Sequence, residues 1–171
     1  MTFVNYICSQ PNNNSTNSKN SKGQKTGLWI ETNGQHKFVS YYLNGKENGV
    51  CYAYSNNKLL YFGEYINGKY AGNWYIFNNK QQLISKITII NADCKKVIVQ
   101  KDMNKKVSYD VEAYITDYYP NLFIKAEGKV LFNNETEILI GEMLNYGIWK
   151  YYDEKGNCVN EIDETGVWNH S

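Results

Sequence analysis

The dipeptide Asn-Gly recurs within a repeated phrase, and it constrains the fold of this chain more than any other feature. Tyr41–Gly49 reads YYLNGKENG and Glu64–Trp74 reads EYINGKYAGNW, so the phrase aromatic-x-Asn-Gly-Lys-x-x-Gly occurs twice. A type I′ hairpin turn needs positive φ at both central residues, which Asn tolerates and Gly adopts freely. The phrase therefore predicts tight hairpin turns at Asn44-Gly45 and Asn67-Gly68.

Further turn signals divide the first part of the chain into short strands. Asn33-Gly34 is a third signal, and Asn56-Asn57 and Asn78-Asn79 follow it at nearly the interval that separates the two copies of the phrase. The runs between these turns are rich in aromatic and β-branched residues, as strands are. They predict an antiparallel meander of six strands: Leu28–Thr32, Lys37–Leu43, Val50–Ser55, Lys58–Ile66, Trp74–Phe77 and Leu83–Ile90.

A second pattern has the same period as the first. Gly-x-Trp or Gly-x-Cys occurs at Gly27–Trp29, Gly49–Cys51 and Gly72–Trp74, almost evenly spaced, and again much further along at Gly147–Trp149. Cys51 stands where the other copies have Trp, which favours a packed structural thiol. Periods of this kind are typical of repeat architectures, in which each unit packs against its neighbour.

These two patterns together resemble the MORN-repeat family, in its variant branch that includes toxin–antitoxin and polymorphic-toxin immunity proteins. The resemblance covers Gly23 to about Ile90 well and Ala126–Asn160 loosely. It implies stacked antiparallel hairpins that form one elongated sheet. The chain departs from the family pattern at Asp93–Tyr119, where no repeat is visible, and at Gly141–Trp149, which is shorter than its counterpart Gly63–Trp74.

The stretch without repeats has a periodicity of its own. Apolar residues recur there at helical spacing, at Val107, Val111, Tyr114, Ile115 and Tyr118, and Pro120 follows. This spacing predicts an amphipathic helix over Lys106–Tyr118. An alternation of strand type that starts at Val107 is the competing interpretation.

The length of 171 residues fits one domain. We expect a disordered polar tail over 1–25 and a single repeat domain over 26–165. That domain would comprise repeats over 26–91, a non-repeat insert over 92–119, and degenerate and final repeats over 120–160. The fold class predicted is thus mainly β, built of tandem antiparallel hairpins with one inserted helix.

Composition argues against several classes of function. The chain has no Arg and a net charge of +1, so it lacks the guanidinium groups that recognise phosphates and guanine, and no nucleic-acid partner is expected. No apolar run approaches the ~18 residues that would cross a bilayer, so no membrane span is expected. The acidic residues near predicted strands occur singly, as surface residues usually do: Glu31, Glu64, Glu112 and Glu142.

The sequence contains no recognisable catalytic or metal-binding pattern. The four cysteines lie far apart and the chain has 2 His, so neither a zinc site nor a Cys–His pair is supported. The glycines follow the repeat and not a phosphate-binding loop, and no serine lies in a nucleophile elbow. We therefore expect no catalytic residues, no metal and no cofactor: the chain is predicted not to be an enzyme.

The aromatic residues are the remaining signal of function. If the strands pair as predicted, Trp29, Cys51, Trp74 and Ile76 project from one face of the sheet and a second group projects from the other. Such a group either stabilises the sheet or forms an interface, since Tyr and Trp dominate binding hot spots. The partner-binding residues predicted are Tyr52, Tyr54, Tyr75 and Phe77, with Asp153 and Glu154 from the acidic C-terminal segment meeting a basic partner.

Two functions follow as expectations. The resemblance implies a cytoplasmic immunity or antitoxin protein that binds a cognate toxin and occludes it. The alternative is an envelope lipoprotein or scaffold module tethered through its N-terminus, since MTFVNYIC followed by a polar stretch has the layout of a lipidated Cys8. That lead is short, lacks a basic start and places Ile7 where a small residue is expected.

Overall fold

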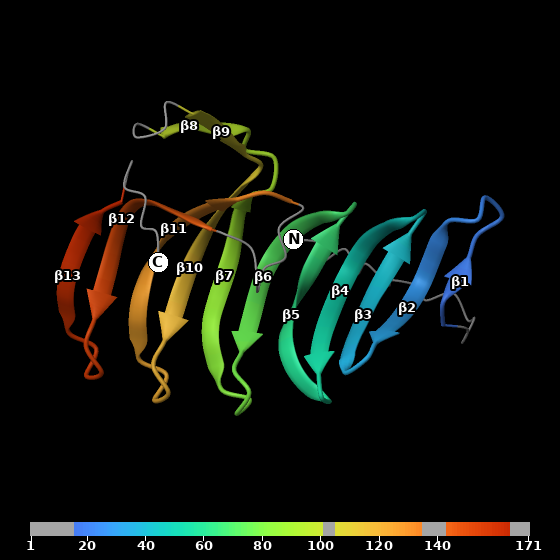
Figure 1. Ribbon diagram of the computed structural model, residues 1–171, viewed down its shortest axis with the longest axis horizontal. Helices are drawn as coiled ribbons and strands as arrows, with labels where there is room; N and C mark the ends of the chain where they lie inside the picture. Colours follow the sequence, from blue (N-terminus) through green and yellow to red (C-terminus); the bar gives the residue numbers. More distant parts are fainter. Residues whose placement is uncertain (1–15, 101–104, 135–142, 165–171) are drawn as a thin grey trace, which may run out of the picture.

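The protein forms one long antiparallel sheet with a small hairpin beside it (Figure 1). The computed structural model describes residues 16–100, 105–134 and 143–164. Eleven strands follow one another in the order β1-β2-β3-β4-β5-β6-β7-β10-β11-β12-β13, and β8 and β9 pair only with each other. The strands are β1 Ser18–Lys19, β2 Lys25–Asn33, β3 His36–Leu43, β4 Lys46–Ser55, β5 Lys58–Ile66, β6 Lys69–Phe77, β7 Leu83–Asn91, β8 Lys96–Gln100, β9 Lys105–Tyr109, β10 Val111–Tyr118, β11 Ile124–Phe132, β12 Leu144–Tyr152 and β13 Cys158–Asp163.

The predicted hairpin turns are confirmed where Asn precedes Gly in the repeated phrase. Asn44 and Gly45 have φ of 50° and 81°, and Asn67 and Gly68 have φ of 53° and 78°. Asn56-Asn57 makes the same turn, with φ of 49° and 61°. At Asn33-Gly34 the turn is displaced along the chain, because Asn33 pairs with His36 and leaves Gly34 and Gln35 at the tip.

The prediction of a two-residue turn at Asn78-Asn79 is wrong. A longer loop over 78–82 joins β6 to β7, and the Asn78 Oδ1 atom accepts hydrogen bonds from the amides of Lys80 (2.9 Å) and Gln82 (3.1 Å). Asn and Asp side chains stabilise loops in this way by bonding to backbone groups further along. The same side-chain bonds recur in the loops that begin at Asn20 and Asp153.

The helix predicted near 106–118 is absent, and the competing strand alternation is what forms. Residues 105–109 are β9, and Val111–Tyr118 are β10, which pairs with both β7 and β11. Val111 and Ala113 point to one face and are fully buried there. The residues of this stretch satisfy both periods, and the hydrogen bonds offered by two neighbouring strands decide between them.

The β8–β9 hairpin is the only part of the predicted 92–119 insert that leaves the main sheet, within the described residues. It lies beyond the ends of the strands, above β10 and β11 in the view of Figure 1. The Cys94 amide donates to the Asp110 carbonyl (2.8 Å), and Lys96 forms an ion pair with Glu112 of β10 (3.5 Å). These contacts attach the hairpin to the strand that follows it.

Most of the buried apolar side chains of the main sheet lie on one face, which we call the core face; Leu131 of β11 is a buried residue of the other face. The core face carries Trp29, Trp74 and Trp149, and its buried cluster is centred on β6, β7, β10 and β11. Both Trp74 and Trp149 pack against a glycine of the preceding strand, at Gly63 and Gly128. The counterpart of Gly63 is therefore Gly128, and not Gly141 as the sequence suggested; Gly141 itself lies outside the described residues.

The glycines of the second pattern have a backbone role. Gly27, Gly49, Gly72 and Gly147 have φ of 71°, 128°, 59° and 72°. Opposite the last three of these glycines the pairing registers shift, which is the mark of β-bulges. In these three copies the Gly therefore bends the strand just before the Trp or Cys enters the core face.

Residues 16–24, which the sequence placed in a disordered tail, form the first edge of the sheet. The Asn17 side chain behaves like a strand backbone, since its Oδ1 accepts from the Ile30 amide (2.7 Å) and its Nδ2 donates to the Ile30 carbonyl (3.0 Å). The Trp29 indole donates to the Ser18 carbonyl (3.1 Å). These bonds cover the otherwise open edge of β2.

Candidate functional site

The face opposite the core carries a row of stacked rings across β4, β5 and β6, which we call the aromatic ladder. Its residues are Tyr52, Tyr54, Phe62, Tyr75 and Phe77. Phe62 is at the centre, with ring centroids 6.1 Å from Tyr52, 4.8 Å from Tyr75 and 6.0 Å from Phe77. Stacked rings at these spacings stiffen the sheet and present a flat apolar surface with hydroxyl groups.

Four of the five ladder residues are those the sequence predicted. Tyr52, Tyr54, Tyr75 and Phe77 lie on one face, and Trp29, Cys51, Trp74 and Ile76 lie on the other. Phe62 was missed, although it pairs directly with both Tyr52 and Tyr75. The signal that could have found it is the strand alternation of Lys58–Ile66, aligned on the turns at either end.

The ladder is accessible to a partner at one end. Tyr52 is 37% exposed, whereas Tyr54, Phe62, Tyr75 and Phe77 are half-buried. The Lys37 ammonium lies 5.6 Å from the Tyr54 ring centroid, so a cation borders the rings there. The ladder thus combines rigidity with partial exposure.

The predicted acidic residues are not brought to the ladder. Asp153 and Glu154 are in the loop between β12 and β13, and β7, β10 and β11 separate that loop's strands from β6. The Asn157 side chain and backbone hold the pKa of Asp153 below its usual value by hydrogen bonding to the carboxylate. The Asp153 carboxylate is therefore engaged in hydrogen bonds within its own loop, and Glu154 is exposed.

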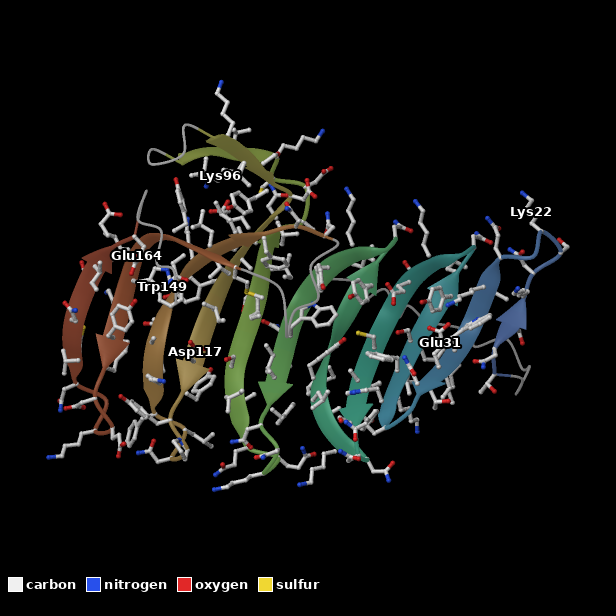
Figure 2. The ribbon with its side chains drawn as sticks, in the orientation of Figure 1. Lys22, Glu31, Lys96, Asp117, Trp149 and Glu164 are labelled. Atoms are coloured by element: carbon white, nitrogen blue, oxygen red, sulfur yellow. The ribbon has the colours of Figure 1, made fainter. Side chains whose placement is uncertain are left out.

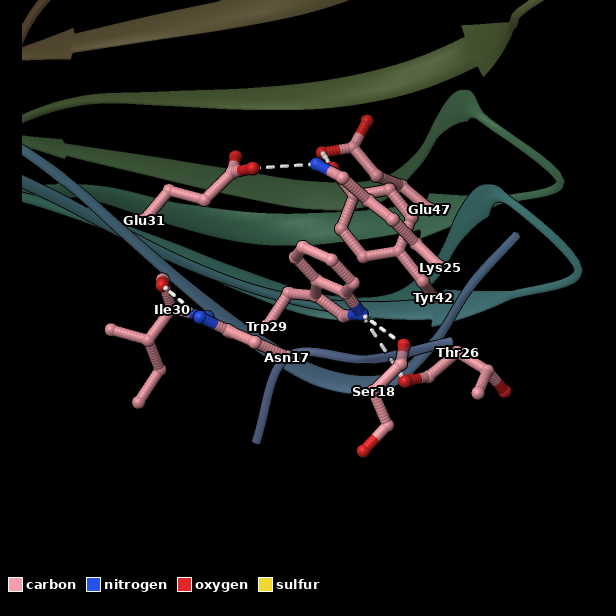
Figure 3. Close-up of polar contacts among 9 residues, drawn as sticks. All are labelled: Asn17, Ser18, Lys25, Thr26, Trp29, Ile30, Glu31, Tyr42 and Glu47. Atoms are coloured by element: carbon pink, nitrogen blue, oxygen red, sulfur yellow. Dashed lines mark hydrogen bonds and ion pairs between the residues drawn. The ribbon is translucent and has the colours of Figure 1, made fainter. Parts of the chain in front are cut away.

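A second group of polar and aromatic side chains lies on the core face, at its β2–β5 end (Figure 3). The Lys25 ammonium is 2.6 Å from Glu31 Oε1 and lies over the rings of Trp29 (4.6 Å) and Tyr42 (4.7 Å). The Tyr42 hydroxyl donates to Glu47 Oε1 (3.3 Å). Figure 2 places Glu31 at this half of the sheet and Trp149 at the other.

Beside these residues the core face opens into a hollow of ≈ 270 Å³. Two carboxylates (Glu31 and Glu47) and four tyrosines (Tyr42, Tyr52, Tyr61 and Tyr65) contribute to its lining, and Tyr52 also belongs to the aromatic ladder. We call it the core-face hollow. The same face is fully buried at Trp74 and Ile87, so the hollow is where the core face becomes accessible.

Burial controls the protonation of the groups in the core-face hollow. Burial raises the pKa of the Glu47 carboxyl, against the opposing hydrogen bonds from Tyr42 and Ser40. Burial also raises the pKa of Tyr42 and raises the pKa of the Cys51 thiol to about 12. For Lys25, burial lowers the pKa, but the bonds with Glu31 and Tyr42 outweigh it and the pKa is raised overall.

The core-face hollow could not be predicted from the sequence, because each residue that lines it is ordinary when considered alone. Glu31 was interpreted as a lone surface acid, yet it pairs with Lys25; Glu112 pairs with Lys96 and Lys129 (3.4 Å). Glu64 is exposed, and Glu142 and Cys8 lie outside the described residues. The one available signal was register, which pairs Tyr42 with Glu47 across a turn.

Among the residues that the structure describes, no three His, Cys, Asp or Glu side chains are grouped so that they could hold a metal ion. The same residues include no helix long and apolar enough to cross a membrane.

No family model and no curated protein matches the chain. One similar solved structure is that of TarM, with a TM-score of 0.20 and 9% sequence identity. The match covers 72% of this chain and 17% of the TarM chain.

Proposed function

We propose that this chain is a non-catalytic protein-binding module, and that it is an immunity or antitoxin protein which occludes a cognate toxin in the cytoplasm. The observation that carries the proposal is the aromatic ladder. Five rings are stacked in a row on a continuous sheet, on the face opposite the core. Rigid Tyr-rich surfaces give large contact area at low entropic cost.

The size of the sheet supports the same proposal. A standard interface needs only about 800 Å² from each partner, and three adjacent strands, β4, β5 and β6, present the ladder. The resemblance of the repeated phrase to variant MORN repeats favours a toxin as the partner. The separation of Asp153 from the ladder means that a basic toxin would need to reach across several strands to contact both.

The test is capture of the partner from the native organism. The full chain should bring down one stoichiometric protein, and co-expression should protect cells from that protein's toxicity. Tyr52→Ala and Tyr75→Ala should each weaken the complex by roughly tenfold or more, as interface hot spots do. Tyr41→Ala is the matched control, because Tyr41 is as exposed as Tyr52, at 37%, and is not part of the ladder.

Two results would overturn the proposal. One is a chain that purifies alone and protects cells from no neighbouring gene product. The other is a complex whose affinity is unchanged by the ladder variants. Either would favour the alternative function, an envelope lipoprotein or scaffold module tethered at Cys8, which mass analysis of the N-terminus tests directly.

A further inference from the structure

We propose that the core-face hollow binds an alkylammonium group, with the side chain of a lysine of the protein partner as its source. The proposal adds a second contact to the proposed function and rests on that function only for where the lysine comes from. The hollow itself is a feature of this chain; it lies mainly on the core face and shares Tyr52 with the aromatic ladder.

The lining has the chemistry that a lysine side chain needs. The carboxylates of Glu31 and Glu47 can pair with an ammonium, and the rings of Tyr61 and Tyr65 can pack against its aliphatic stem. Charge-assisted hydrogen bonds and ring faces both attract such a cation. The volume of ≈ 270 Å³ leaves room for an extended side chain.

The chain itself demonstrates that this end of the core face accepts an ammonium. Lys25 Nζ contacts Glu31 at 2.6 Å and lies over two rings, at 4.6 Å from the Trp29 centroid and 4.7 Å from that of Tyr42. Lys25 is not among the residues that line the hollow. An incoming ammonium would meet the same kinds of group further into the hollow.

One carboxylate of the lining remains for the incoming cation. Glu31 is paired with Lys25, whereas Glu47, within the described part of the chain, accepts a bond from the Tyr42 hydroxyl and forms no ion pair. Burial raises the pKa of Glu47, so an ammonium beside it would relieve an unfavourable buried charge. The hollow therefore carries two carboxylates beside one lysine: among the described residues Glu47 has no close ion-pair partner, and Lys25 lowers its pKa only through a longer-range charge interaction.

The experiment uses the full-length chain, isotope-labelled for amide spectra, and two small probes. One probe is Nα-acetyl-lysine methylamide; the other is Nα-acetyl-norleucine methylamide, which has a similar stem without the ammonium. The lysine probe should bind about tenfold more tightly than the norleucine probe and shift the amides of Ser40, Cys51 and Tyr61. Equal affinity for the two probes, or shifts elsewhere on the sheet, would overturn the proposal.

Single substitutions distinguish the effect of the Glu47 carboxylate on probe affinity from the effect of the Lys25 ammonium. Glu47→Gln should weaken the lysine probe about fivefold or more, and Lys25→Met should strengthen it about threefold, because the competing charge is removed. Glu64 is an exposed carboxylate that does not line the hollow, so Glu64→Gln should leave the affinity for the lysine probe unchanged. An unchanged affinity in Glu47→Gln with a native amide spectrum would refute the role of Glu47. If that variant unfolds, Glu47→Asp, which keeps the charge but withdraws it by one methylene, should weaken the lysine probe and leave the norleucine probe unchanged.

The probe result can be separated from the ladder proposal as long as Tyr52, which lines the hollow and belongs to the ladder, is left unchanged. No toxin is needed, so a failure of the lysine probe leaves the ladder proposal intact, and a failure of partner capture leaves the probe result intact.

Discussion

The indole ring of Trp74 lies directly against the backbone of Gly63, so closely that a Cβ atom on Gly63 would overlap the ring. The same relationship recurs between Trp149 and Gly128, where the added Cβ would be 2.5 Å from the ring. Gly63 and Gly128 do not have positive φ. Their lack of a side chain is therefore a matter of packing, and it makes room for two of the largest residues of the core.

Gly63→Ala should destabilise the protein by about 1–3 kcal/mol, because the indole must move out of a packed site. The measurement is chemical or thermal unfolding. A double-mutant cycle isolates the cause: when Trp74 is already Leu, adding Gly63→Ala should cost much less. A full cost in the Trp74→Leu background would mean that the glycine is needed for another reason.

Gly68→Val should lower the stability by about 1–3 kcal/mol, because a β-branched residue resists positive φ. Gly68 has φ of 78° in the turn between β5 and β6. Asn67→Gly at the neighbouring turn position, where φ is 53°, is the matched control and should be tolerated. Unchanged thermal stability in Gly68→Val would contradict the turn.

The turns could be predicted from the sequence because their cause is local. Asn44-Gly45 and Asn67-Gly68 adopt positive φ through their own chemistry, with no need of distant partners. The register of the strands between them follows from the turns. That local control is also why the order β2 to β7 could be predicted as a meander.

The failures have non-local causes. The stretch Val111–Tyr118 is a strand because β7 and β11 bond to it from both sides, and both lie outside the stretch whose periodicity was ambiguous. The Lys25–Glu31 pair and Glu47 form one site only after three strands have aligned. The aromatic ladder was predicted more fully because alternation along single strands already sorts its residues by face.

Asp117→Asn should raise stability at neutral pH relative to the parent chain, and the gain should shrink as the pH falls toward 3.8, the ordinary pKa of an Asp side chain. Burial raises the pKa of Asp117, despite the hydrogen bond from Ser85, so the folded state holds a proton more tightly than the unfolded state. Stability is therefore lost as the pH rises through the raised pKa, and the charged form is the costly one. Melting temperatures at neutral and at acidic pH provide the comparison.

Asp153→Asn is the matched control, because the pKa of Asp153 is shifted in the opposite direction from that of Asp117. The Asp153 pKa is lowered by hydrogen bonds from Asn157 and Lys155, so its contribution is present above pH 3.8 and lost as the pH falls through the lowered value. The variant should be less stable than the parent at neutral pH, with the difference fading in acid. The same pH trend in both variants would show that net charge, and not local environment, governs the response.

The Cys51 thiol should be inert in the folded protein. It is 4% exposed on the core face, and burial raises its pKa to about 12. Near neutral pH only a very small fraction of such thiols is ionised, and the thiolate is the reactive form. A variant with Cys8→Ser, Cys94→Ser and Cys158→Ser should therefore resist a disulfide reagent until denaturant is added, when its one thiol reacts.

The control for Cys51 is a variant that keeps Cys158 as its one thiol. Because Cys158 is exposed, this variant should react with the same reagent at once, without denaturant. Rapid labelling of Cys51 in the native protein would show that the reagent reaches the thiol through the core-face hollow, which Cys51 lines. It would also contradict the structural role that the place of Cys51 in the Gly-x-Trp pattern predicts, since a thiol that packs as Trp does in the other copies must stay closed to solvent.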